Sequence, residues 1–196
     1  DLIAKIERSI AAFSRLDVKV LKRALMANPD WRIGQLGDLA TLSKESFLGK
    51  NLTIESRVVG MDDMVPFATW QESFSPAGSI GGSLNRFKEG DILYGKLRPN
   101  LRKVAISTFN GFCSSEVLVI RPRPGVSVEF LHAILSSDSF LDSVLKFAKG
   151  TKMPRINPSD LLKIEVGIPE APIQYLLSLK LAKLNVLEVA AQRMIL

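Results

Sequence analysis

The hydrophobic period of the sequence changes twice, and this change restricts the possible folds more than any other feature of the chain. Residues 1–28 and 169–196 carry apolar side chains at the spacing of an amphipathic helix. Between them, residues 29–168 hold short β-rich runs separated by glycine-containing turns, followed by two more helical patterns. This order predicts an α/β chain of the mixed α+β kind, with a β-rich head and a helical stalk made of the N- and C-terminal amphipathic helices.

The central region is expected to contain both helices and strands. Ser127 is placed to cap one helix and Asp138 a second, which ends near Gly150. Strands are expected where β-branched and apolar residues cluster, and a short turn is expected before the last strand. The predicted strands are 52–59, 91–97, 103–107, 117–121 and 164–168, with the turn at 158–162.

The last helix carries an apolar stripe with a mean spacing of 3.5 residues, which is the period of a coiled coil. The stripe consists of Ile173, Leu177, Leu181, Leu184, Leu187, Ala191 and Met194. Such a stripe needs a partner, and the N-terminal helical zone is the nearest candidate. The same face is also suited to joining two copies of the chain. The alternative is that both terminal helices lie on the core of the head.

The residues that carry catalysis or hold metals are too few to predict an enzyme or a metal site. With one Cys and one His, the chain can form no internal disulfide and no Cys–His zinc cluster. We expect Cys113 to be a buried thiol, His132 to pack within an apolar helix, and the adjacent Asp62 and Asp63 to be solvated. No apolar run is long enough to span a membrane, and a cytoplasmic location is therefore expected.

The positive charge of the chain is concentrated in two segments. The whole sequence has 26 basic and 20 acidic side chains, a net charge of +6. Residues 86–103 hold six basic and two acidic side chains, and residues 121–163 hold seven and four. A concentrated excess of this kind favours a surface that faces a polyanion such as nucleic acid.

Five short motifs occur in an order that resembles a known family. They are Gly-Asp-Ile-Leu at 90–93 with a basic loop after it, Cys-Ser-Ser-Glu at 113–116, a helix pair, Gly-Thr-Lys-Met-Pro-Arg-Ile at 150–156, and a proline-led segment that reaches Gln174. With the opening Trp31 and Leu-Gly-Asp-Leu at 36–39, they resemble a target recognition domain of the specificity subunits of type I restriction-modification systems. The likeness covers residues 31–184.

The resemblance implies a function and a set of partners. Such a domain is non-catalytic and recognises one half of a bipartite site in double-stranded DNA. A partner subunit methylates adenine with S-adenosylmethionine, so this chain itself is expected to bind no cofactor, and a restriction or translocase subunit is a further partner. Family members usually carry two such domains, and this chain has room for one. We expect a half-length subunit that dimerises, or the C-terminal piece of a methyltransferase fused to its own recognition domain.

Two basic segments are the predicted DNA-contacting loops. In the first, Lys96, Arg102 and Lys103 suit phosphates, whereas Arg98 has the donor geometry for guanine and Asn100 the geometry for adenine. In the second segment, the predicted contacts are Lys149, Thr151, Lys152 and Arg155. A third loop competes with these two, and its predicted contacts are Trp70, Gln71 and Ser73. The alternative for these residues is solvated charge or local packing. The alternative for the chain is a protein-interaction adaptor that makes no contact with DNA.

Overall fold

The computed structural model describes residues 31–193 apart from 44, 50–51, 54 and 78–81, with side chains described as far as residue 182. The predicted helical segment 1–28 lies outside the described residues, and so does that half of the predicted stalk. Within the described part of the chain, no helix is long and apolar enough to cross a membrane.

The described elements are twelve strands, five α-helices and one 3-10 turn. The strands are β1 (Arg32–Gln35), β2 (Ala40–Leu42), β3 (Ser46–Leu48), β4 (Arg57–Val59), β5 (Trp70–Gln71), β6 (Ser75–Pro76), β7 (Ser83–Phe87), β8 (Ile92–Gly95), β9 (Val104–Ser107), β10 (Gly111–Ser114), β11 (Val117–Pro122) and β12 (Glu165–Ile168). The helices are α2 (Leu36–Leu39), α3 (Val128–Leu135), α4 (Asp138–Phe147), α5 (Pro158–Leu161) and α6 (Ala171–Arg193), and the 3-10 turn is η2 (Pro99–Leu101).

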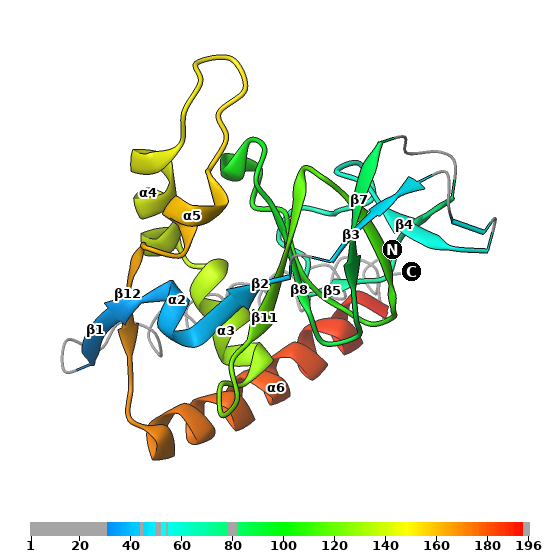
Figure 1. Cartoon of the computed structure of the whole chain (residues 1–196). Helices are drawn as coiled ribbons and strands as arrows, with labels where there is room; N and C mark the ends of the chain where they lie inside the picture. The colour runs from blue at the N-terminus through cyan, green and yellow to red at the C-terminus, as the bar shows by residue number, and fades with distance from the viewer. Residues whose placement is uncertain (1–30, 44, 50–51, 54, 78–81, 194–196) are drawn as a thin grey trace, which may run out of the picture.

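A five-stranded sheet, ordered β2-β11-β8-β9-β5, lies at the centre of the head and is covered on both faces (Figure 1). Successive side chains of a strand point to opposite faces. Ile92 and Tyr94 of β8 therefore join the main core with the helices, while Leu93 between them joins a second core against the other five-stranded sheet, β3-β7-β10-β4-β6. Burial on both faces explains why β8 and β11 are apolar at nearly every position.

A third sheet, made of β1 and β12, joins the beginning of the head to its end. The two strands pair antiparallel, with Arg32 opposite Ile168 and Gln35 opposite Glu165. Directly after β1, the Leu36 N–H donates to the Ile164 carbonyl at 2.9 Å. Residues separated by about 130 positions are thereby held together, and α6 starts from the same end of the head (Figure 1).

Four of the five predicted strands are present in the structure, the fifth is present in part, and the remaining strands were missed. The runs at 91–97, 103–107, 117–121 and 164–168 correspond to β8, β9, β11 and β12. The run at 52–59 is a strand only from Arg57, because a turn in which the Ser56 N–H donates to the Thr53 carbonyl precedes it. The missed strands, β1, β2, β3, β5, β6, β7 and β10, have no clear alternating pattern in the sequence.

Helix α3 begins at the predicted cap, whereas α4 begins at a different one. The Ser127 Oγ accepts a hydrogen bond from the Phe130 N–H at 3.1 Å. For α4 the cap is Ser137, whose Oγ accepts from the Phe140 N–H at 3.2 Å, so the prediction that Asp138 caps this helix is wrong. Asp138 is instead the first helical residue, and its carboxylate is available to another partner.

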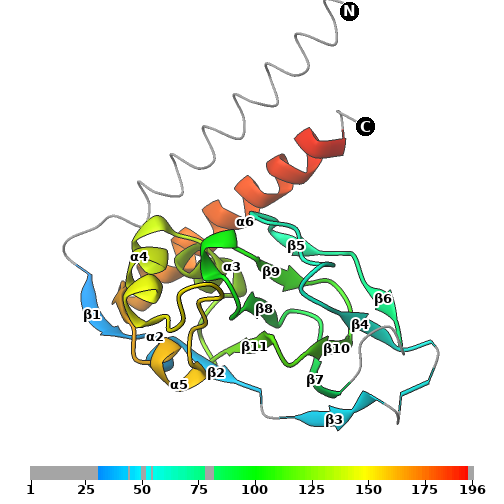
Figure 2. The ribbon, with the colours of Figure 1, turned by 90° about the horizontal axis from the view of Figure 1, so that it is seen from above.

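The first half of α6 packs on the head (Figure 2). Leu177 and Leu181 are 5% and 1% exposed and belong to the main core, and α6 contacts α3. This confirms, for these two positions, the alternative in which the helix lies on the core of the head. Ile173 is 42% exposed, so it lies outside that core. The last four side chains of the predicted stripe, Leu184, Leu187, Ala191 and Met194, lie outside the described side chains.

Cys113 is buried between the two large sheets, as predicted. Burial is the main cause that raises the pKa of this thiol from 9.0 to about 12. Above pH 9 the thiol of the unfolded chain ionises while that of the folded chain does not. The free energy of unfolding therefore decreases as the pH rises from 9 to about 12. We expect the folded protein to resist alkylation by iodoacetamide at pH 8 and the unfolded protein to react fully, as measured by mass spectrometry. Equal rates in both states would contradict this.

Candidate nucleic-acid interface

The two predicted basic loops meet at one end of the head. Figure 1 shows both rising from the same end, the segment around η2 in green and the segment around residue 150 in yellow. The Arg98 N–H donates to the Pro154 carbonyl at 2.7 Å, and the Ile156 N–H donates to the Lys96 carbonyl at 3.1 Å. We call residues 96–103 and 149–156 the two-loop surface. It carries seven basic and no acidic side chains.

The second loop of this surface is closed by its own backbone. Lys149 and Arg155 exchange two hydrogen bonds of 2.9 Å, and Gly150 next to them has a φ of 100°, which favours glycine. Lys149, Thr151 and Lys152 are exposed. The Arg155 guanidinium makes two hydrogen bonds, of 3.0 and 3.2 Å, with the Glu116 carboxylate. The loop therefore presents two lysines and a hydroxyl to solvent. Arg155 instead connects the loop to Glu116, which lies in the turn between β10 and β11.

The first loop is a tight turn around η2. Arg98 and Arg102 flank it with φ angles of 50° and 52°, and the Arg102 N–H donates to the Pro99 carbonyl at 3.0 Å. Pro99 is buried, whereas the side chains of Arg98 and Asn100 are exposed. Left-handed backbone at a non-glycine residue costs about 1 to 3 kcal/mol and persists only when the surroundings enforce it. The turn thus holds Arg98 and Asn100 outward on a rigid base.

Arg102 and Lys103 anchor the loop in the head. The Arg102 guanidinium forms an ion pair with Asp138 and donates to the Ser136 carbonyl at 3.2 Å. The Lys103 ammonium donates to the Met61 carbonyl at 2.5 Å. These two side chains therefore differ from Arg98, Lys149 and Lys152, for which the described residues provide no ion-pair partner. Sequence reasoning grouped Arg102 and Lys103 with the exposed cations because their acceptors lie far away in the chain.

The third predicted loop does not join the two-loop surface. Trp70 is half-buried and packs on the main core from β5, and it pairs with Ile106 of β9. The Gln71 side chain is 2% exposed, and its amide donates to the carbonyls of Asp63 and Ser73 at 3.0 and 2.6 Å. Ser73 is exposed. The described packing thus engages Trp70 and Gln71 inside the head.

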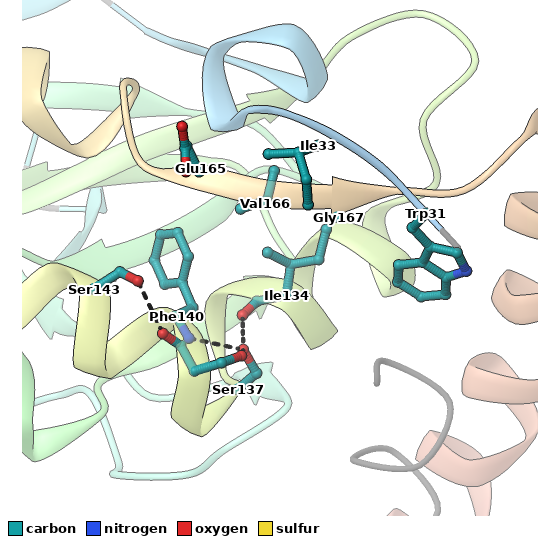
Figure 3. Close-up of a pocket in the computed structure, with 10 residues that line it drawn as sticks. Trp31, Ile33, Ile134, Ser137, Phe140, Ser143, Glu165, Val166 and Gly167 are labelled. Atoms are coloured by element: carbon teal, nitrogen blue, oxygen red, sulfur yellow. Dashed lines mark hydrogen bonds between the residues drawn. The ribbon is translucent and has the colours of Figure 1, made fainter. Parts of the chain in front are cut away.

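A pocket of about 350 Å³ lies between α4 and the β1–β12 sheet (Figure 3). Its lining combines apolar residues such as Phe140 and Val166 with serines. The Ser137 Oγ donates to the Ile134 carbonyl at 2.8 Å, and the Ser143 Oγ donates to the Ser139 carbonyl at 3.1 Å. The hydroxyls of Ser137 and Ser143 therefore donate to carbonyls of the helix backbone.

Comparisons with known proteins identify the class of domain that has this fold. A family model described as "Type I restriction modification DNA specificity domain" matches residues 28–185. The EcoDI specificity subunit of an Escherichia coli type I restriction enzyme is 33% identical over 96 residues, which is 49% of this chain and 21% of that protein.

Two solved structures share the fold. The HsdS subunit from Thermoanaerobacter tengcongensis has a TM-score of 0.64 at 14% identity, over 99% of this chain and 48% of that chain. A structure concerned with complex assembly and conformational transition of the type I R-M system has a TM-score of 0.67 at 14% identity, over 97% of this chain and 49% of that chain. The chain thus spans about half of these structures and a fifth of the EcoDI subunit.

The match of the family model covers most of the described residues, and the head, the helix pair and the part of α6 up to residue 185 fall inside it. The chain belongs to the family of type I restriction-modification DNA specificity domains. The resemblance inferred from the five motifs is confirmed, and so is the mixed α+β fold.

Proposed function

We propose that this chain is a sequence-specific DNA recognition module that binds one half of a bipartite site and directs the methylation or cleavage carried out by partner subunits. The observation that supports it most is the joining of two loops, more than 45 residues apart in the sequence, whose residues include seven basic and no acidic side chains. Counterion release makes such a surface favourable for duplex DNA.

The side chains of this surface have different tasks in the proposal. Lys149 and Lys152, which are exposed, neutralise phosphates together with the partly buried Lys96. Arg98 and Asn100 contact base edges in the major groove, because arginine matches the two acceptors of guanine and asparagine the donor and acceptor of adenine. The other predicted contacts, Arg102, Lys103 and Arg155, hold the loops in place through their partners in the head.

The partners follow from the family. The catalytic step belongs to an adenine methyltransferase subunit or fused domain that binds S-adenosylmethionine, while this chain binds no cofactor and performs no catalysis. A restriction or translocase subunit joins the same complex in the cytoplasm. The exposed apolar side chains of α6, among them Ile173 and Leu176, suit a contact with the methyltransferase or with a second copy of the chain.

Selection of bound sequences tests this proposal. The chain, in complex with its methyltransferase, is incubated with a pool of random duplexes, and the enriched sequences give a consensus. Arg98→Ala and Asn100→Ala should each relax the consensus at one or two adjacent base pairs, by about 1 to 3 kcal/mol of discrimination. Thermal stability should stay the same, since both side chains are exposed.

Two exposed residues of the same types serve as controls. Arg123 and Asn110 lie outside the two-loop surface. Replacing either residue by Ala should therefore leave the consensus unchanged. A consensus that is insensitive to Arg98 and Asn100 but changes with Ser73→Ala would assign base recognition to the third loop. Failure to enrich any sequence would favour the protein-interaction adaptor.

A further inference from the structure

Backbone strain marks a third segment beside the two-loop surface. Among the residues that the structure describes, three non-glycine residues have positive φ angles, namely Phe67, Arg98 and Arg102. Arg98 and Arg102 flank η2, and the Phe67 N–H donates to the Arg102 carbonyl at 3.2 Å. All three strained positions therefore belong to one site. Strain of this kind tends to occur where a structure holds side chains ready for a partner.

Phe67 combines this strain with exposure. Its φ is 63° and its side chain is 58% exposed, and the neighbouring Val65 is also 58% exposed. An exposed aromatic ring contributes little burial to the fold, and for a bulky residue a left-handed backbone is unfavourable. The exposure of the ring and the backbone conformation therefore favour a residue that tolerates positive φ at this position over a phenylalanine.

The Phe67 ring is nevertheless held in a defined place. The Arg102 guanidinium lies over it, 5.6 Å from the ring centroid, and is itself bound to Asp138 at the start of α4. Two residues further on, the Thr69 carbonyl accepts a hydrogen bond from the Ile106 N–H at 2.8 Å. One face of the ring is thus covered by a fixed cation, so the ring cannot insert between two base pairs, which requires both of its faces.

We propose that Phe67 is a specificity-determining residue that contacts the C5-methyl group of a thymine next to the base pairs contacted by Arg98 and Asn100. This inference rests on the proposed DNA-binding function. The thymine methyl is the apolar group that base pairs present in the major groove, and phenylalanine is among the residues that contact it. The uncovered part of a ring fixed at the rim of the two-loop surface provides an apolar contact where Arg98 and Asn100 provide only polar ones.

Deoxyuridine substitution tests the contact, because uracil lacks only the methyl group. Each thymine of the selected consensus duplex is replaced in turn, and the dissociation constant is measured for the wild type and for Phe67→Asn. Asparagine tolerates a left-handed backbone, so the variant should keep or raise the thermal midpoint. We expect the wild type to lose about fourfold in affinity at one thymine, and the variant to bind the thymine and uracil duplexes alike.

Phe47→Asn is the matched control, since Phe47 is also an exposed phenylalanine but lies on β3 and packs edge-on against Phe112. It should keep the uracil response of the wild type. The same uracil response in Phe67→Asn as in the wild type would overturn the inference, as would a lower thermal midpoint, which indicates a structural role. If no consensus sequence is enriched, both the proposed function and this inference fail. If a consensus is enriched but no uracil substitution changes the affinity of the wild type, only this inference is overturned.

Discussion

Replacing Lys149 and Lys152 together by Ala is expected to lower the affinity for duplex DNA about sixtyfold at 0.1 M salt. Each phosphate contact adds about 0.9 to the slope of the logarithm of affinity against the logarithm of salt concentration. If this electrostatic contribution vanishes near 1 M salt, each contact is worth about eightfold at 0.1 M. The variant should therefore also have a slope shallower by about 1.8, as measured by fluorescence anisotropy over a salt series.

The matched control for this variant is Lys88→Ala with Lys180→Ala. Both lysines are exposed and lie outside the two-loop surface, and the double substitution changes the net charge by the same amount. Its slope should remain within about 0.4 of the wild-type value, because distant charges are screened. Equal effects of the two double substitutions would mean that DNA responds to net charge and not to this surface.

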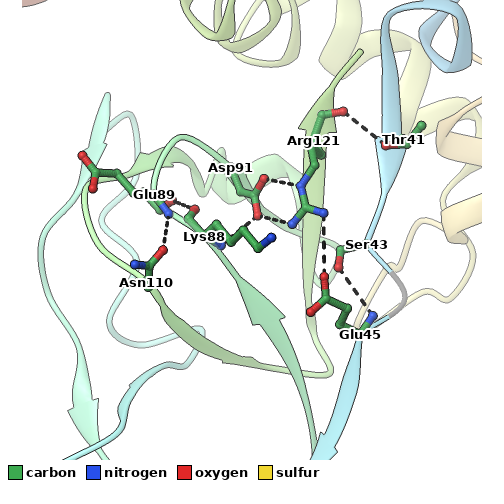
Figure 4. A network of polar contacts seen from close by, with 9 residues as sticks. Thr41, Ser43, Glu45, Lys88, Glu89, Asp91, Asn110 and Arg121 are labelled. Atoms are coloured by element: carbon green, nitrogen blue, oxygen red, sulfur yellow. Dashed lines mark hydrogen bonds and ion pairs between the residues drawn. The ribbon is translucent and has the colours of Figure 1, made fainter. Parts of the chain in front are cut away.

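Asp91→Ala is expected to lower the free energy of unfolding by about 3 kcal/mol, a large part of the total stability of a domain. The Asp91 side chain is 4% exposed, and its carboxylate accepts from the Lys88 N–H and from two nitrogens of Arg121, each at 2.8 Å (Figure 4). The hydrogen bonds with Asp91 raise the pKa of Arg121. The guanidinium also remains charged when Asp91 is removed, because arginine is protonated at any ordinary pH. Urea denaturation measures the loss.

Two further variants distinguish the stability contributed by the ion pair from the effect of removing an arginine that is not part of it. Arg121→Met removes the other partner, and in a double-mutant cycle with Asp91→Ala the coupling should exceed about 1 kcal/mol. Arg123→Met changes an exposed arginine whose side chain donates to the Gly37 carbonyl, and it should cost less than about 1 kcal/mol. Additive effects of Asp91→Ala and Arg121→Met would show that the pair does not act as a unit.

Much of the fold was predictable because the relevant signals are local. The apolar runs of β8, β9 and β11 and the serine cap of α3 depend on a few adjacent residues. The order of the five motifs along the chain is also sufficient to indicate the family. The short strands were not predictable in this way, because β5 and β6, for example, have two residues each and exist only through pairing with β9 and β4.

The sequence by itself determined where the basic residues lie in the chain and that two basic segments flank a helix pair. Only the tertiary structure decided which of these cations face solvent. Arg102 and Arg155 pair with Asp138 and Glu116, which lie 36 and 39 residues away, and the Lys103 ammonium donates to a carbonyl 42 residues away. A hydrogen bond acts only at contact distance, and contacts between distant residues arise from the packing of sheets and helices. The same packing places Phe67 beside Arg102, although no local pattern indicates a left-handed phenylalanine.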